Sequence, residues 1–282
     1  MAWADRSRPV ARLRAGMPPR AGMARGNAVA VALWTAAGLG LLAGAWQWGA
    51  TVLGPFVLPS LQETGQAMVR LAVSGAAGPA LLATLVHALG GCLAGGAVGL
   101  VLGIAGGLAL PVGAMSRPVF TALLGTPPIA WVVLALLWFG PGGAAASFTV
   151  AITAAPILFL AALEGVGSRD PALAEMALLY RAPPLQRLTD LVLPALADFL
   201  LPALATALAF SFKVAVMAEV LSGADGVGGG LATARAHFDL AATMAWIVLA
   251  VAVLLIADAL LLAPLRGWRA AREGRAGVPP QA

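Results

Sequence analysis

The stretch AEMALLYRAPPLQRLTDLVLP, from Ala174 to Pro194, is charged and punctuated by proline, yet long apolar segments precede and follow it. Asp170-Pro171 just before it is a helix start signal. The apolar residues that then recur at helical spacing are Leu173, Met176, Ala177 and Tyr180. Pro183-Pro184 is predicted to end this helix, and a second short helix is predicted to lead to Leu193-Pro194. This helix–turn–helix favours either a docking surface for a partner protein or an ordinary amphipathic loop at a membrane interface.

The composition identifies an integral membrane protein. The 282 residues are 61% hydrophobic and 10% charged, and the mean hydropathy is +0.92. A soluble domain is about 45–50% apolar and about 25% charged, so this chain has too little polar surface to fold in water. Cys92 is the single cysteine and His87 and His237 are the two histidines, which excludes an intrachain disulfide and a Cys/His metal site.

Six apolar runs reach the length of about 20 residues that a membrane span requires. They cover about 28–48, 80–111, 118–139, 145–165, 192–221 and 240–264. The first run is longer than the core of a signal peptide and is interpreted as a signal-anchor, although Ala43-Gly44-Ala45 resembles a cleavage site. We therefore expect an all-α integral membrane protein with six transmembrane helices. Its predicted organisation is a basic tail (1–26), a first span with an outer amphipathic segment (27–79), a core of five spans (80–264) and a second basic tail (265–282).

The arginines orient these spans. With the N-terminus in the cytoplasm, all 17 lysines and arginines except Arg70, Lys213 and Arg235 fall in cytoplasmic segments. This agrees with the positive-inside rule and predicts that both termini and the 170–194 loop are cytoplasmic. The net charge of +5 is then an orientation signal that also favours anionic lipid, and no nucleic-acid partner is predicted.

Several segments together resemble one known family. Glu175 followed by Ala177, with Leu193-Pro194 at matching spacing, resembles the EAA loop of ABC importer permeases. The similarity to the nitrate/sulfonate/taurine branch rests on LPSLQETGQAMVRLAVSG (58–75), PPIAWVVLALLWFG (127–140), Asp170-Pro171, VAVMAEVLSGADGVGGGL (214–231) and Asp258. The resemblance covers about 58–268 and implies a non-catalytic permease subunit in a bacterial inner membrane, importing a small anionic solute.

The resemblance also implies partners. A separate ABC ATPase would dock on the loop, and a soluble binding protein would deliver solute on the outer face. Two copies of the chain, or the chain with a similar permease, would enclose the pathway. The residues expected at the ATPase contact are Ala174, Glu175, Ala177, Arg181, Leu193 and Pro194.

The chain is expected to bind no cofactor, and ATP is expected on the partner ATPase. A Walker A loop needs Gly-Lys followed by Ser or Thr, whereas Lys213, the single lysine, lies between Phe212 and Val214. The glycine cluster GVGGGL (226–231) lacks the spacing of a dinucleotide fingerprint.

The loop departs from the family pattern at two positions. Met176 stands at the second position of the Glu-Ala-Ala triplet, where the family has alanine, and Arg181 replaces the glycine that closes the first helix. Because a left-handed cap is unfavourable for arginine, the turn is predicted to be made by Pro183-Pro184 instead.

A second pattern predicts close helix packing. The glycines that recur at every fourth position of the second run are Gly91, Gly95, Gly99, Gly103 and Gly107. Small residues at this spacing let two helix backbones approach closely in lipid, either within the chain or between subunits. Simple tolerance of glycine in membrane helices is the alternative.

Four residues are candidates for the translocation pathway: Pro127, Pro128, Lys213 and Glu219. The prolines would kink the third span, either beside a pathway or as a structural feature only. Lys213 and Glu219 are six residues apart, on different helix faces, so no local ion pair is expected. Lys213 therefore faces a watery cavity, pairs with an acid on another span, or snorkels to the interface.

Two rival functions remain open on the sequence. An ion-coupled secondary transporter would use Lys213, Glu219 and Asp258 as relays, but the inverted repeat expected of that class is missing. A membrane hydrolase would need a nucleophile motif such as GxSxG, which does not occur, and neither histidine has an evident acid partner.

Overall fold

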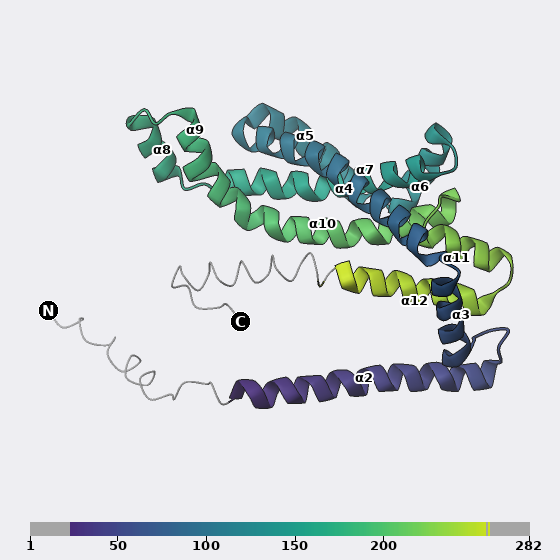
Figure 1. Cartoon of the computed structure of the whole chain (residues 1–282). Coiled ribbons are helices and arrows are strands. Elements are labelled where there is room, and N and C mark those ends of the chain that lie inside the picture. Colours follow the sequence, from purple (N-terminus) through teal and green to yellow (C-terminus); the bar gives the residue numbers. More distant parts are fainter. Residues whose placement is uncertain (1–22, 258, 260–282) are drawn as a thin grey trace. The chain divides into compact units, whose positions relative to one another are not determined.

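The computed structural model describes residues 23–257 and residue 259 of the chain. This described part is helical and contains no strand (Figure 1). In chain order its elements are α2 (Met23–Leu53), α3 (Leu61–Val73), α4 (Ala77–Leu108), α5 (Leu110–Gly125), α6 (Pro128–Phe139), α7 (Gly143–Gly167), α8 (Pro171–Leu179), α9 (Pro184–Arg187), the π-helical turn η2 (Leu188–Val192), α10 (Leu193–Ser222), α11 (Val227–Ala236) and α12 (Leu240–Ala257).

The helices include the long apolar segments that a membrane protein needs. Within the described residues, five helices are long and apolar enough to cross a bilayer, or six if the bent pair α5–α6 is one span. The apolar runs predicted at 145–165 and 192–221 agree with α7 and α10 to within two residues at each end. The predicted all-helical membrane architecture is confirmed, with five to six candidate spans.

The third predicted span differs from the structure. Instead of one kinked helix over 118–139, the chain forms α5 and α6, which meet at 98°. Thr126 and Pro127 are extended between them, because Pro128 disfavours helical backbone at the residue before it and neither proline can donate a backbone hydrogen bond. Two prolines in succession therefore break the span rather than kink it.

Contacts divide the chain into two compact units, one up to Leu61 and one from Gln62 onward. In the first unit, Trp46 Nε1 donates a hydrogen bond to the Pro59 carbonyl at 2.9 Å. The Leu61 amide donates to Gln47 Oε1 at 3.3 Å, so the end of α2 fixes the turn that leads into α3.

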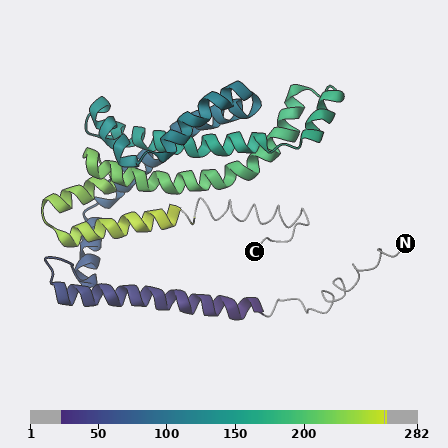
Figure 2. The same cartoon turned by 180° about the vertical axis from the view of Figure 1, so that it is seen from behind.

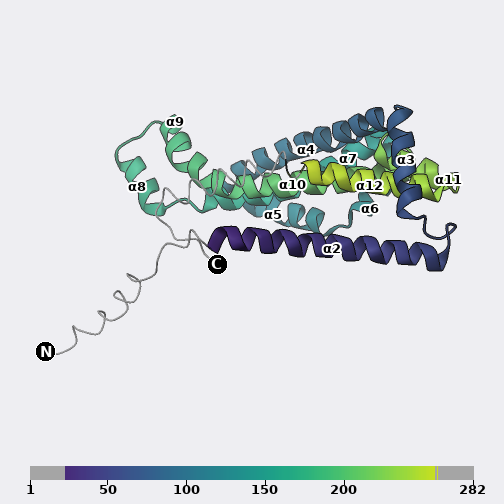
Figure 3. The same cartoon turned by 60° about the horizontal axis from the view of Figure 1, so that its bottom comes forward.

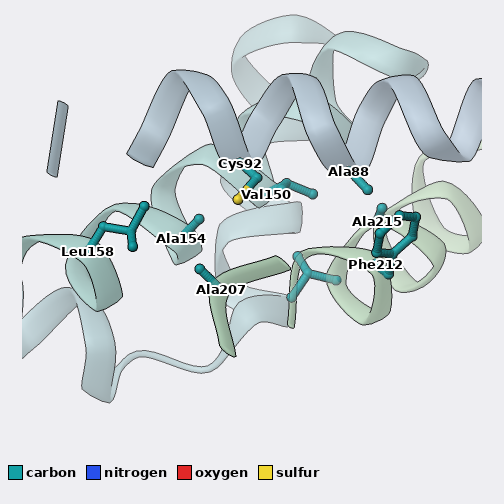
Figure 4. Close-up of a cluster of buried hydrophobic side chains, with 9 residues drawn as sticks. Ala88, Cys92, Val150, Ala154, Leu158, Ala207, Phe212 and Ala215 are labelled. Carbon is teal, nitrogen blue, oxygen red and sulfur yellow. The ribbon is translucent and has the colours of Figure 1, made fainter. Parts of the chain in front are cut away.

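The main core of the second unit lies where α4, α7 and α10 pack together (Figures 1 and 2). Most of its side chains are small, which lets the three helices approach closely without hydrophobic driving force from water. The buried cluster, most of which Figure 4 labels, is Ala88, Cys92, Val150, Ala154, Leu158, Ala207, Phe212, Val214 and Ala215.

The glycine face predicted on α4 lies against α7 of the same chain. A β-carbon on Gly95 or Gly99 would overlap the carbonyl oxygen of Ala151 or Ala155. Gly91, Gly103 and Gly107 likewise meet the backbone or β-carbons of α7. The sequence left open whether a neighbouring span or a second subunit meets this face, and the structure identifies the neighbouring span.

The two ends of this bundle carry different elements. α8 and α9 lie at one end and α11 lies at the opposite end, which we call the α8 end and the α11 end (Figure 3). At the α8 end, Arg169 Nε donates to the Val166 carbonyl at 2.5 Å and Arg169 Nη2 donates to the Gly107 carbonyl at 3.2 Å. One guanidinium thus joins the last turns of α4 and α7 to the start of the loop.

Candidate functional site

The loop at the α8 end begins as the sequence predicts. Asp170 Oδ1 accepts a hydrogen bond from the Ala172 amide at 2.8 Å, and Pro171 occupies the first helical position. This satisfies an amide that the first turn of a helix leaves free, and proline suits the position because it has no amide to satisfy. The predicted helix after Asp170-Pro171 is confirmed as α8, and α9 with η2 forms the short second helix.

Arg181 makes the turn that was assigned to the prolines, so that expectation was wrong. Its φ is +51°, in the left-handed region. The Ala182 amide donates to the Ala177 carbonyl at 2.9 Å, across the turn that Arg181 forms. This is the glycine-type helix end of the Schellman motif, with arginine in the glycine's position. The departure from the family pattern therefore changes the residue but keeps the turn.

Replacing Arg181 by glycine is expected to stabilise the loop. Glycine adopts left-handed backbone without the cost of about 1 kcal/mol that a β-carbon imposes. For a chain of this size the melting temperature should rise by about 2–4 °C, measured by thermal unfolding in detergent. Ala182→Gly, at a neighbour without positive φ, is the matched control and should lower it. A lower melting temperature for Arg181→Gly would contradict the assigned role of the backbone.

The side chains of this loop face outward from the chain. Glu175 and Arg181 are exposed, and so are the apolar Met176, Leu179 and Tyr180, the last two by 81% and 78%. At the end of the loop, Leu193 and Pro194 are exposed too. Ala177 is half-buried, whereas the side chain of Ala174 is outside the part that the structure describes. The loop thus presents a charged and apolar surface that this unit of the chain does not cover.

Pro127 and Pro128 lie at the break between α5 and α6. Pro127 is exposed and Pro128 is half-buried. They line neither the cavity at Lys213 nor the cavity beside α11. Their contribution to a pathway stays a prediction.

Lys213 lies on the wall of a cavity of about 260 Å³ between α10, α12 and the start of α11. Its side chain is exposed, and within the described residues it has no salt bridge. The described residues that line it are Thr84, Phe212, Lys213, Val216, Val227, Ala250, Val251, Val253 and Leu254. Apart from the Thr84 hydroxyl and the Lys213 ammonium, these side chains are apolar.

Glu219 lies on the same helix but points into the protein. Its side chain is fully buried, and its carboxylate accepts from Thr84 Oγ1 at 2.8 Å and from the Gly228 amide at 3.0 Å. The other oxygen is 2.9 Å from His87 Nδ1. The Val227 amide in turn donates to Thr84 Oγ1 at 2.9 Å. We call Thr84, His87 and Glu219 the carboxylate cluster; it joins α4, α10 and α11.

The carboxylate cluster corrects the statement that neither histidine has an acid partner, since His87 pairs with Glu219. His237 is exposed and contacts the Thr233 carbonyl at 2.8 Å. Thr84 was not singled out in the sequence, because a threonine in an apolar run has no distinguishing pattern. The described residues contain no group of three or more His, Cys, Asp or Glu that could hold a metal ion. Asp258 and both basic tails, apart from residues 23–26, lie outside the described residues.

Comparisons with known proteins agree with this architecture. The profile of the family described as binding-protein-dependent transport system inner membrane component matches residues 95–263. The chain is 26% identical over 250 residues to the putative aliphatic sulfonates transport permease protein SsuC of Bacillus subtilis, across 88% of this chain and 87% of that protein. It is 30% identical to the bicarbonate transport system permease protein CmpB of Synechococcus elongatus and 27% identical to the nitrate import permease protein NrtB of Leptolyngbya laminosa. Each of these two alignments covers 148 residues, 52% of this chain and 53% of the relative.

A solved structure shares the fold. The methionine ABC transporter MetNI, in inward-facing conformations, gives a TM-score of 0.51 at 18% identity. The match covers 64% of this chain and 92% of the MetNI chain. At this identity the likeness concerns the arrangement of helices alone.

Proposed function

We propose that this chain, a member of the family of binding-protein-dependent transport system inner membrane components, takes its energy from an ATPase docked on α8 and imports a small anion. It is a non-catalytic, multi-pass permease subunit of an ABC importer in the inner membrane, and ATP binds to the partner ATPase. The ion-coupled transporter that the sequence left open is set aside, because importers of this family are driven by ATP. The ATPase contact, the solute and the membrane topology below are our inferences.

The ATPase docks on α8 and the turn that follows it. The observation that carries this inference is the exposed surface of Glu175, Met176, Leu179 and Tyr180 at one end of the bundle. A short helix that exposes apolar side chains beside a carboxylate is suited to docking in a groove on another protein. Arg169 supports the same inference, because it links this loop directly to the ends of α4 and α7. Movement of the ATPase thereby reaches the spans.

The topology follows from this contact. The α8 end and both termini face the cytoplasm, in agreement with the distribution of arginine. The α11 end then faces outward, where a soluble binding protein delivers the solute. A second copy of the chain, or a similar permease, completes the pathway. One surface open to that copy or to lipid is an exposed apolar stripe on α6, formed by Ile129, Val133 and Leu137.

The solute is a small anion of the sulfonate, nitrate or bicarbonate type. Two observations support this class. The relatives are described as permeases for aliphatic sulfonates, bicarbonate and nitrate. The cavity beside α10 has one ammonium, that of Lys213, on walls that are otherwise largely apolar. Within the described residues no carboxylate neutralises this ammonium, so it is free to attract an anion.

Replacing Glu175 by arginine is expected to weaken ATPase docking without affecting membrane insertion. Reversal of one charge in a docking surface costs about 1 kcal/mol or more, so recovery of the ATPase with the tagged permease should fall about fivefold. The measurement is co-purification in mild detergent from cells that express both subunits.

Arg235→Glu is the matched control for this charge reversal. Arg235 is exposed on α11, at the opposite end of the bundle, and its variant should recover the ATPase like the wild type. Equal recovery with Glu175→Arg, together with unchanged transport, would show that the ATPase docks elsewhere.

A further inference from the structure

The buried carboxylate of Glu219 holds three segments together at the α11 end. It accepts hydrogen bonds from the Thr84 hydroxyl and the Gly228 amide through one oxygen, and its other oxygen pairs with His87 Nδ1. Thr84 is on α4, Glu219 is on α10 and Gly228 is in the first turn of α11. For His87 to donate from Nδ1, that nitrogen must carry the proton. Both oxygens of this buried group thus have hydrogen-bond partners, so neither is buried unpaired.

The glycine cluster after α10, which had no explanation as a nucleotide-binding loop, is shaped around this carboxylate. Gly226 has a φ of +143°, and a β-carbon there would collide with the Glu219 carboxyl group. A β-carbon on Gly228 would be 2.6 Å from the β-carbon of Glu219. A β-carbon on Gly143, at the start of α7, would lie 2.5 Å from His87 Nε2, so this glycine leaves room for the imidazole ring. The loop therefore closes tightly over one acidic side chain.

The same residues form a wall of the Lys213 cavity. Thr84 and Val227 both line that cavity, and the Val227 amide is bonded to Thr84 Oγ1. Separation of the start of α11 from α4 would therefore open the cavity and break the carboxylate cluster at once. Partial separation is unfavourable, because it leaves a buried carboxylate without its donors. The closed arrangement makes all of these hydrogen bonds, whereas an open arrangement would expose the carboxylate to water.

The geometry points to a latch: Glu219 is a positioning residue that holds α11 on α4 and so closes the Lys213 cavity at the α11 end. The latch goes beyond the proposed function and rests on it for two statements, that this end faces outward and that the solute approaches Lys213. In the open state solute enters toward Lys213, and in the closed state the cavity is sealed from that side. Thr84 is the shared element, since its hydroxyl both donates to Glu219 and accepts from the α11 backbone.

The test uses one cysteine on the cavity wall of the full-length chain. Cys92→Ala removes the native thiol, and Val216→Cys places a thiol among the lining residues. Intact cells are treated from outside with 2-sulfonatoethyl methanethiosulfonate, which is anionic and does not cross membranes. Thr84→Val should raise the labelling rate about tenfold, as expected when a hydrogen bond to a charged group is lost, and Glu219→Gln should do the same. Thr84→Ser, which keeps the hydroxyl, should label like the parent.

Two further variants separate a latch from general loosening. Thr153→Val makes the same change at a buried threonine of α7 whose hydroxyl donates to carbonyls of its own helix, and it should leave the rate unchanged. The double variant Thr84→Val, Glu219→Gln should label no faster than the faster single variant, because both changes break one network. Equal rates in all variants, a Thr153→Val effect as large as that of Thr84→Val, or additive effects would each overturn the latch.

A reference thiol distinguishes failure of the latch from failure of the proposed topology. Ala236→Cys is at the exposed end of α11 and should be labelled rapidly in every background. If it is not labelled from outside, the α11 end does not face outward and both inferences fail. If it is labelled while the Val216→Cys rates do not respond, only the latch is wrong. Labelling requires neither the ATPase nor transport. If Glu219→Gln does not accumulate in membranes, the comparison of Thr84→Val with Thr84→Ser decides.

Discussion

Replacing Gly99 by leucine should prevent the chain from assembling. A β-carbon at Gly99 would overlap the Ala155 carbonyl and approach the Phe159 amide nitrogen to 3.1 Å, so both obstacles are backbone of α7 and cannot rotate away. Overpacking against a flexible side chain costs about 1–3 kcal/mol, and a leucine against fixed backbone should reach at least the top of that range. The measurement is the yield of monodisperse protein after detergent extraction and size-exclusion chromatography, with thermal unfolding of whatever is recovered.

Gly90→Leu is the matched control on the same helix. A β-carbon at Gly90 meets no atom within 4 Å, so this leucine should be accommodated and the yield should equal that of the wild type. Equal yields from Gly99→Leu and Gly90→Leu would mean that α4 does not pack on α7 through its glycine face. Loss of both proteins would mean that α4 tolerates no added volume on either face.

Replacing Lys213 by methionine should abolish most transport while the importer still assembles. Methionine fills a similar volume but has no charge, so an anion loses its only ammonium on the cavity wall. A hydrogen bond to a charged group contributes about 1.5–3 kcal/mol, which predicts a loss in uptake rate of at least about tenfold. Uptake of a labelled alkanesulfonate, nitrate and bicarbonate would be measured in cells with the permease, its ATPase and its binding protein, alongside recovery of the ATPase.

Lys213→Arg is the conservative comparison and should retain part of the activity, because charge matters more at this position than forked geometry. Uptake by Lys213→Met equal to that of the wild type would rule out the ammonium as a binding group for the solute. Loss of ATPase recovery in Lys213→Met would instead indicate a structural role for the lysine.

The sequence predicted the helices well where composition alone determines them. The limits of α7 and α10 follow from long apolar runs bounded by glycine and charge, and α8 begins at a standard signal, Asp170-Pro171. Helix length in a bilayer is set by membrane thickness, so it can be read from a single segment. The glycine spacing on α4 predicted close packing for the same reason, since the pattern lies within one helix.

The remaining features depend on contacts between distant segments or on backbone detail. His87 and Glu219 are separated by 132 positions, and no local pattern connects a histidine in α4 with an acid in α10. Glu219 was grouped with Lys213 as a pathway candidate because both are ionisable residues in one span, whereas rotation about the helix axis directs one inward and the other outward. At Arg181 the conformational preference of the residue gave the wrong prediction. Left-handed backbone is unfavourable for arginine, yet the surrounding chain requires this turn and Arg181 adopts it.

The joint contacts of α4 and α7 have a mechanical consequence. With glycines against α7 along the second half of α4, the two helices cannot slide or bend independently there, so they behave as one stiff beam. Arg169 pins the loop to the end of that beam through carbonyls of both helices. α4 has 32 residues, hence a length of about 48 Å at about 1.5 Å per residue. A tilt of about 5° imposed at the end held by Arg169 would displace the far end by about 4 Å. This displacement exceeds the donor–acceptor distance of a hydrogen bond, which is about 3 Å. A small rotation at the loop is therefore sufficient, by leverage alone, to change which atoms meet at the other end.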